Sequence, residues 1–349
     1  VTITNTTISK NVAADGGGIA SDGSVDGLGL RSSFTLTNST VTENEAHASG
    51  GGALIAGEDT ITITEVIFSK NKAHDAGGGL NTGDRSGGII TRATFTDNET
   101  HGEGGGAWIG SERLVTIQDS TFTGNNAGIP EPGDIFDPAG ANVANGGGLY
   151  SENGPLTVTG STFTGNTATE QGGGISLDNH GDVVISNSII QNNRAEHDGG
   201  GVENSATKVV FERLLIQNNY AVLNGGGIHN SSSGLFTLLD TTVLLNSGQS
   251  GGGLANAPDN DIIIRRCLFL RTTARHPAFI EGEPAEDAGL GGGIFSLADG
   301  DSLYENTTVS GNTAAVAGGG IFHDADGELM LVNLTIWRNS APRGGGVGV

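Results

Sequence analysis

Short runs in which hydrophobic and polar residues alternate recur along the whole chain. Typical runs are VTITNTTISKN (residues 1–11), FTLTNSTVTEN (residues 34–44) and LTVTGSTFTGN (residues 156–166). The first, third and eighth residues of these runs are apolar, and mostly polar residues separate them. A period of two residues predicts β-strands, broken by a turn near the fifth residue. The spacing of three and four residues that marks an amphipathic helix does not occur.

A glycine triplet follows each run and defines a repeat unit. Twelve triplets begin at Gly16, Gly50, Gly77, Gly104, Gly146, Gly172, Gly199, Gly225, Gly251, Gly291, Gly318 and Gly344. Eight of the eleven spacings are 26 or 27 residues, and the others, of 34, 42 and 40 residues, indicate insertions. A further strand follows each triplet, so we expect three short strands per unit. The repeat therefore predicts an all-β fold, a parallel β-helix solenoid of about twelve 26–27-residue coils.

Residues one repeat apart become neighbours on adjacent strands of such a solenoid, so the repeat predicts columns of like side chains. The third and eighth positions form apolar columns, which we expect to build the core. The eleventh position is Asn in eleven of the twelve units, and Thr272 is the exception. We expect these amides to form a stacked ladder inside a turn. The prediction is a single domain over residues 1–349, with insertions at residues 21–33, 128–145 and 275–290.

The composition excludes several classes of protein. The 349 residues contain 39 Asp and Glu against 16 Lys and Arg, which gives a formal net charge of −23. This charge excludes a nucleic-acid binder, because phosphate contacts need clustered Lys and Arg. No apolar run reaches the roughly 18 residues that a membrane-spanning helix needs, and a single Cys excludes a disulfide scaffold. Both ends interrupt the repeat, so we expect the chain to be a fragment of a longer one.

The repeat resembles two overlapping groups of bacterial β-helix proteins. One is the polymorphic outer-membrane protein repeat, whose Phe-x-x-Asn and Gly-Gly-Ala marks correspond here to FSKN (68–71), FTDN (95–98), FTGN (122–125), and GGA (51–53 and 105–107). The other is a broad set of secreted right-handed parallel β-helix repeat proteins with units similar to TLTNSTVTEN followed by GGGI. The resemblance implies a right-handed, secreted or surface-displayed protein that is often adhesive. Most units depart from the first family by carrying Gly where that family has Ala.

Aromatic residues lie beside the two longer insertions. We expect the residue after the inward one in each triplet strand to face outward, and this column contains Trp108, Tyr150 and His229. A flat ring offers apolar area to a sugar or a partner chain, so these three are the ligand-binding candidates. The alternative is that apolar residues of the insertions bury the rings, which we favour for Phe295 and Phe322.

Two sets of side chains have the chemistry of metal ligands. Acidic turn residues of adjacent coils could share a Ca²⁺ ion, which prefers oxygen ligands: Asp259, Asp261, Asp299, Asp301, Asp324 and Asp326. Three imidazoles at equivalent places in successive coils could hold a transition metal: His47, His74 and His101. The alternatives are solvated carboxylates that cap turns and the mere repetition of an exposed residue. We expect no required cofactor, with Ca²⁺ as the candidate ligand.

The outward positions change character along the chain. They are mostly Thr or Ser in the first six units and become apolar in later units. The residues predicted to form an interface are Val210, Leu215, Leu244, Leu268, Leu270 and Trp337. Contiguous exposed apolar surface marks a contact site, so we expect this face to meet another chain or domain, including a copy of the same chain.

The sequence favours a noncatalytic module at the cell surface or outside a bacterium, structural or adhesive, which binds a partner protein or a glycan. The alternative is a polysaccharide lyase or glycoside hydrolase, with Glu203, Glu170 and Asp198 as candidate catalytic carboxylates. These residues lie near His197 and His229 in the repeat, but an anionic solenoid would repel a polyuronate. Ice binding through Thr-x-Thr arrays is a third hypothesis, and the arrays cover only half of the repeats.

Overall fold

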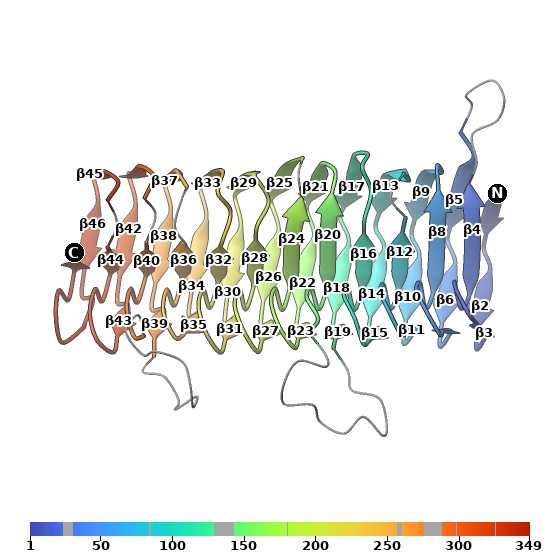
Figure 1. Ribbon diagram of the computed structural model, residues 1–349, viewed down its shortest axis with the longest axis horizontal. Coiled ribbons are helices and arrows are strands. Elements are labelled where there is room, and N and C mark those ends of the chain that lie inside the picture. Colours follow the sequence, from blue (N-terminus) through green and yellow to red (C-terminus); the bar gives the residue numbers. More distant parts are fainter. Residues whose placement is uncertain are drawn as a thin grey trace. The chain divides into compact units, whose positions relative to one another are not determined.

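The computed structural model describes residues 1–23, 31–83, 85–128, 143–179, 181–256, 260–275, 288–297, 299–324 and 326–349. The larger parts of the second and third predicted insertions, and Asp259, lie outside these residues. The chain forms two compact units, Val1–Val183 (unit 1) and Val184–Val349 (unit 2). Within each unit, strands from successive coils lie side by side in parallel sheets, which we name A to D by their place in the coil (Figure 1).

Unit 1 has four sheets, and each takes one strand from every coil. Sheet A contains β1 (Thr2–Thr4), β5 (Ser33–Thr37), β9 (Thr60–Thr64), β13 (Gly87–Thr91), β17 (Val115–Gln118) and β21 (Leu156–Thr159). Sheet B contains β2 (Thr7–Ser9), β6 (Thr40–Thr42), β10 (Ile67–Ser69), β14 (Thr94–Thr96), β18 (Thr121–Thr123) and β22 (Thr162–Thr164). Sheet C contains β3 (Val12–Ala13), β7 (Glu45–Ala46), β11 (Lys72–Ala73), β15 (Glu99–Thr100), β19 (Asn126–Ala127) and β23 (Thr167–Ala168). Sheet D contains β4 (Ile19–Gly23), β8 (Ala53–Gly57), β12 (Leu80–Thr82), β16 (Ala107–Ile109), β20 (Leu149–Asn153) and β24 (Ile175–Asn179).

Unit 2 repeats the same order of strands, and β25 (Asp182–Ser186) contains the boundary between the units. Its sheet A contains β29 (Lys208–Glu212), β33 (Leu235–Leu239), β37 (Ile262–Arg265), β41 (Ser302–Glu305) and β45 (Leu329–Val332). Its sheet B contains β26 (Ile189–Gln191), β30 (Leu215–Gln217), β34 (Thr242–Leu244), β38 (Leu268–Leu270), β42 (Thr308–Ser310) and β46 (Thr335–Trp337). Its sheet C contains β27 (Arg194–Ala195), β31 (Tyr220–Ala221), β35 (Ser247–Gly248), β39 (Thr273–Ala274) and β43 (Thr313–Ala314). Its sheet D contains β28 (Val202–Asn204), β32 (Ile228–Asn230), β36 (Leu254–Asn256), β40 (Ile294–Ser296), β44 (Ile321–His323) and β47 (Val347–Gly348).

The predicted all-β parallel solenoid is confirmed, but each coil has four strands where three were expected. The additional strands form sheet C and are two residues long, which is too short to leave a periodic signal in the sequence. The predicted turn at the fifth position is a single residue in the left-handed region, with φ of 48° at Asn38, 49° at Arg92 and 48° at Asp240. One such residue between two strands turns the chain without a longer loop.

The core of each unit consists of the predicted columns. In unit 1, Phe68, Phe95, Phe122 and Phe163 are fully buried. Their rings stack in sequence with centroids 4.9, 4.5 and 4.6 Å apart. This spacing matches the separation of adjacent strands, so identical side chains at the eighth position form a continuous apolar stack.

The predicted asparagine ladder is also confirmed within both units. Asn71 donates from Nδ2 to Oδ1 of Asn98 at 3.0 Å and to the carbonyl of Val41 at 3.0 Å. Thr272 replaces the amide in the step toward the next coil, because its hydroxyl donates to Oδ1 of Asn312 at 2.8 Å. Each buried amide thus meets partners on neighbouring coils, as buried polar groups require.

Candidate functional site

A buried pair of ionisable residues lies on the outer face of sheet D in unit 2. Val202 of β28 pairs with Ile228 of β32, and Glu203 pairs with His229 in the same register. Because alternate residues of a strand face opposite sides, Val202 points to the core while Glu203 and His229 point away from it. Nδ1 of His229 lies 2.7 Å from Oε2 of Glu203. The hydroxyl of Ser231 donates to Oε1 of Glu203 at 2.7 Å.

This pair is largely withdrawn from solvent, although it lies outside the main core. The exposed fraction of the side chain is 2% for Glu203 and 13% for His229. Burial lowers the pKa of the His229 imidazole, but the charge and hydrogen bond of Glu203, with the charge of Asp198, raise it to about 9. The imidazole is therefore positively charged at neutral pH and balances the Glu203 carboxylate.

The arrangement suits proton transfer. Glu203 holds Nδ1 and fixes the ring, as an orienting carboxylate does in catalytic histidine pairs. The second nitrogen, Nε2, is then the atom that could donate a proton to a ligand. A buried pair of ionisable side chains is energetically costly in a solenoid whose repeat does not need it. This cost, with the raised pKa of His229, marks the pair as a candidate for function.

The other predicted catalytic residues are placed differently. Asp198 is buried in the turn before β28 and accepts a hydrogen bond from the backbone N–H of Asn224 at 2.7 Å. His197, its neighbour in the chain, is exposed. Glu170 belongs to unit 1, where its backbone N–H donates to the carbonyl of Ala144 at 3.1 Å. The structure therefore brings Glu203, His229 and the charge of Asp198 together, and Glu170 is not part of this group.

The outer face of sheet D in unit 1 carries the predicted aromatic residues. Trp108 of β16 pairs with Tyr150 of β20 on the adjacent strand, as the repeat predicted. Trp108 is partly exposed, but Tyr150 is 6% exposed, so the expectation that Tyr150 presents an open ring is wrong. Burial, followed by the charges of Glu103, Glu152 and Asp178, raises the pKa of the Tyr150 phenol.

The sequence analysis assigned no role to Glu103 or Glu152. Glu103 lies in the turn just before a glycine triplet, and Glu152 lies two residues after Tyr150 on the same face of β20. Neither residue lies at a repeat position where most units carry the same type of side chain, so no periodic signal marked them. The position of Glu152 could have been inferred from the pairing of β20 with β24, which sets it directly beside Asp178.

The rest of the outer column in unit 2 has no charged residue, and Ala255 and Phe295 in it are buried. Phe295 is 5% exposed and packs in a cluster with Ala255, Leu290 and Ala317. Phe322 is partly buried against this cluster, and its ring centroid lies 6.0 Å from that of Phe295. The expected burial of the Phe pair is therefore confirmed. The insertion residues that were expected to cover the pair lie outside the described part of the chain.

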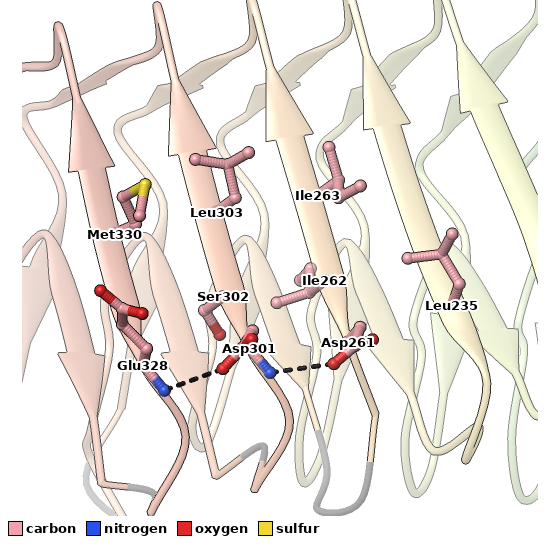
Figure 2. Close-up of a pocket in the computed structure, with 9 residues that line it drawn as sticks. All are labelled: Leu235, Asp261, Ile262, Ile263, Asp301, Ser302, Leu303, Glu328 and Met330. Atoms are coloured by element: carbon pink, nitrogen blue, oxygen red, sulfur yellow. Dashed lines mark hydrogen bonds between the residues drawn. The ribbon is translucent and has the colours of Figure 1, made fainter.

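A groove on the outer face of sheet A in unit 2 combines an acidic edge with an apolar wall. Figure 2 shows Asp261, Asp301 and Glu328 in a row at the edge, next to Leu303 and Met330. Oδ1 of Asp261 accepts the backbone N–H of Asp301 at 2.9 Å, and Oδ1 of Asp301 accepts that of Glu328 at 3.2 Å (Figure 2). These two carboxylates therefore serve as caps for the next strand, which was the alternative interpretation for acidic turn residues.

The remaining metal candidates do not converge. Asp299, Asp324 and Asp326 are exposed, and Asp259 lies outside the described residues. Across the described ranges, no group of three His, Cys, Asp or Glu side chains has an arrangement that could hold a metal ion. The rings of His74 and His101 are neighbours with centroids 5.0 Å apart. His47 lies at the equivalent place in its coil and is exposed. Calcium and transition-metal binding stay predictions.

The predicted interface residues face outward in unit 2. Leu268 is 40% exposed and Trp337 is 56% exposed. The other members are partly exposed: Val210, Leu215, Leu244 and Leu270. Their orientation agrees with the repeat, and their role as a contact surface stays a prediction. Among the described residues, none belongs to a helix that could cross a membrane.

Comparison with known proteins identifies the fold. The family described as "Right handed beta helix region" matches residues 1–133 and 91–247. Among solved structures, the periplasmic alginate epimerase AlgG is similar with a TM-score of 0.50 and 11% identity, over 89% of this chain and 73% of that one. A double mutant of the same epimerase gives a TM-score of 0.40 and 12% identity, over 87% and 73% of the two chains. No curated protein has a significantly similar sequence. Since the family match covers more than half of the residues, the chain belongs to the right-handed beta helix family.

Proposed function

We propose that the protein acts on a polysaccharide outside the cytoplasm and that Glu203 and His229 form its proton-transfer pair. The observation that carries the proposal is the 2.7 Å contact between Nδ1 of His229 and Oε2 of Glu203 at a position withdrawn from solvent. A solenoid with a long regular face suits an extended polymer better than a small molecule. The proposal favours the enzymatic alternative over the noncatalytic surface module.

Each residue of the pair has a defined task. Glu203 orients the imidazole through Nδ1, and Ser231 fixes the second carboxylate oxygen. His229, with its pKa of about 9, is protonated at neutral pH. It donates the Nε2 proton to the glycosidic oxygen as the bond from that oxygen to the sugar carbon breaks. A proton donor at the leaving oxygen is needed in hydrolysis, in which water adds to the sugar carbon that this oxygen leaves. β-Elimination needs a uronate, so a neutral or cationic polymer makes hydrolysis the proposed reaction class.

The fold of a solved relative supports the choice of substrate class. The similar structure is described as a periplasmic alginate epimerase, an enzyme named for a polysaccharide and for a location outside the cytoplasm. The identity of 11% limits this support to an analogy between folds. The net charge of −23 argues that the polysaccharide is neutral or cationic, because an acidic polymer would be repelled.

The test is a turnover assay on neutral, cationic and anionic polysaccharides that follows both new reducing ends and unsaturated products. We expect His229→Gln to lower turnover by about a hundredfold or more, as loss of a general acid does. We also expect turnover to fall as the pH rises through about 9. His197→Gln is the matched control, since His197 is an exposed histidine of the same unit. Full activity in His229→Gln, or binding of a glycan without turnover, would refute the proposal and favour a noncatalytic module.

A further inference from the structure

The groove on the outer face of sheet A in unit 2 contains two parallel rows of side chains that run across its strands. The apolar row consists of residues at the same place on adjacent strands, as Figure 2 shows: Ile263, Leu303 and Met330. The acidic row consists of the residues two positions earlier in the chain: Asp261, Asp301 and Glu328. Alternate residues of an extended chain face the same side, so both rows point away from the core.

The apolar row is open to solvent. Met330 is 47% exposed, and Ile263 and Leu303 are half-buried. Leu235, which also lines the groove, is 38% exposed. The same outer position of β33 carries Thr237, which pairs with Ile263, so the coil itself does not need an aliphatic residue there. Contiguous aliphatic side chains on an outer face indicate a contact surface.

The acidic row makes the groove negative along one flank only. Across the described residues, no ion pair includes Asp261, Asp301 or Glu328, and their side-chain hydrogen bonds are those that Asp261 and Asp301 accept from backbone N–H groups. On the other flank, Arg265 balances Glu305 at 2.8 Å. Like charges opposite each other on adjacent strands repel, so cationic groups placed along the acidic row would stabilise it.

We propose that this groove binds an amphipathic α-helix of a partner protein, with the apolar stripe of the helix on the apolar row and its Lys or Arg side chains along the acidic row. Adjacent strands lie about 4.8 Å apart, and one helical turn rises about 5.4 Å. Side chains on one face of an extended segment lie about 6.6 Å apart, which fits the rows less well. A helix that crosses the strands therefore brings about one apolar and one basic side chain to each coil.

Other occupants fit the groove less well. A second copy of this chain has a net charge of −23, and its described residues form no helix. A metal ion would make no use of the apolar row, and the described acidic residues form no metal-holding group. The groove lies on sheet A and the proton-transfer pair lies on sheet D, so this site goes beyond the proposed function and its test does not depend on turnover.

The probe is a labelled synthetic peptide of about 14 residues, roughly 21 Å long as a helix. It carries Leu at alternating three- and four-residue steps, Lys along one flank of the Leu stripe and Gln elsewhere. The matched peptide has the same composition in an order that scatters Leu and Lys around the helix. We expect the probe to bind the whole chain at least about tenfold more tightly than the matched peptide, because only the probe can meet both rows at once. Fluorescence anisotropy measures both affinities, and circular dichroism measures the gain of helix on binding.

Two variants test the two rows separately. The acidic-row variant combines three changes that remove charge and keep the amide oxygen as an acceptor: Asp261→Asn, Asp301→Asn and Glu328→Gln. We expect it to bind the probe about tenfold more weakly and to lose most of the dependence of the affinity on salt. The apolar-row variant, Leu303→Thr with Met330→Thr, introduces the residue that β33 already carries there. We expect a similar loss that persists at high salt.

A control variant separates the groove from general attraction to an acidic protein. It removes the same number of exposed carboxylates from unit 1 and should bind the probe as the wild-type protein does: Asp22→Asn, Asp97→Asn and Glu112→Gln. Urea unfolding of each variant checks that the β-helix persists. If the apolar-row variant failed to fold, the acidic-row variant would still decide the test, because its substitutions keep the backbone hydrogen bonds of Asp261 and Asp301.

Three outcomes would overturn the proposal. The first is equal affinity for the probe and the matched peptide, and the second is a loss of affinity in the control variant as large as that in the acidic-row variant. The third is a concentration-dependent dimer of the wild-type protein in sedimentation experiments that the apolar-row variant abolishes. That result would identify a second copy of the chain as the occupant of the groove.

Discussion

The outer faces of sheet D in the two units have the same backbone and different chemistry. In unit 1, the adjacent strands carry Trp108 and Tyr150, and the charges of nearby carboxylates raise the pKa values of Glu103 and Tyr150. In unit 2, the equivalent face carries Glu203 balanced by His229. The solenoid fixes which residues are neighbours on this face in both units. The ionisable side chains at these positions differ from one unit to the other.

The glycine triplets explain why this face can vary. Gly199 and Gly225 begin their triplets with φ of 64° and 65°. This left-handed conformation favours glycine, and a side chain at Gly225 would collide with the backbone of Ile228 and His229. The glycines thus let the preceding turn fold closely against the outer column. Side chains there become buried without belonging to the main core, and their identity is not constrained by the repeat.

The first prediction contrasts one carboxylate from each unit. Glu203→Gln removes the partner of a buried imidazolium, and breaking such a pair costs about 3–5 kcal/mol. Glu103→Gln removes a carboxylate whose pKa is raised by burial, so we expect a change below about 1 kcal/mol in either direction. Urea unfolding followed by circular dichroism measures both.

The double variant Glu203→Gln with His229→Gln serves as the control for the first prediction. It should recover part of the lost stability, because no unpaired charge is left buried. If Glu103→Gln destabilised the protein as much as Glu203→Gln does, the charge balance of the two units would not differ in the way described.

The second prediction concerns the pH dependence that His229 of unit 2 should contribute between pH 6.5 and about 9. The pKa of His229 is raised from 6.5 to about 9 in the folded state. The stability that this shift contributes is therefore fully present below about pH 6.5 and is lost as the pH rises through about 9. A shift of this size corresponds to about 3 kcal/mol.

Unfolding experiments between pH 6 and pH 10 test that pH dependence, with the wild-type protein and His229→Gln compared at each pH. The variant should have the flatter profile over the alkaline range. Parallel profiles for the two proteins would mean that the pair does not hold His229 in its charged form.

Much of the fold was predictable because residues one repeat apart in the sequence become neighbours on adjacent strands of a solenoid. The inward columns, the corner at the fifth position and the contact between Asn71 and Asn98 followed from residues 27 apart becoming neighbours. The adjacency of Glu203 and His229 followed from the same register, 26 residues apart. These features depend on local pattern and repetition alone, which the sequence records directly.

Features that recur in only a few coils could not be predicted in the same way. A second amide ladder joins Asn204, Asn230 and Asn256 in unit 2, with Nδ2 to Oδ1 distances of 2.6 and 2.7 Å. Only a few coils carry Asn at that position, so no column was visible. The burial of Tyr150 and the approach of Glu103 to Trp108 depend on how each turn folds over sheet D, and turns are the least periodic part of the coil.

The third and smallest effect concerns the two neighbouring carboxylates of unit 1. Like charges directly opposite on adjacent strands are destabilising, so Glu152→Gln should raise the free energy of unfolding by a few tenths of a kcal/mol. The gain should shrink at high salt, because exposed charges are screened. Asp240→Asn is the matched control in unit 2, since Asp240 pairs with Arg266 at 2.6 Å and its loss should lower stability slightly. Urea unfolding at low and high ionic strength measures both variants. A loss of stability in Glu152→Gln comparable to that in Asp240→Asn would mean that the favourable contacts of Glu152 outweigh its repulsion by Asp178.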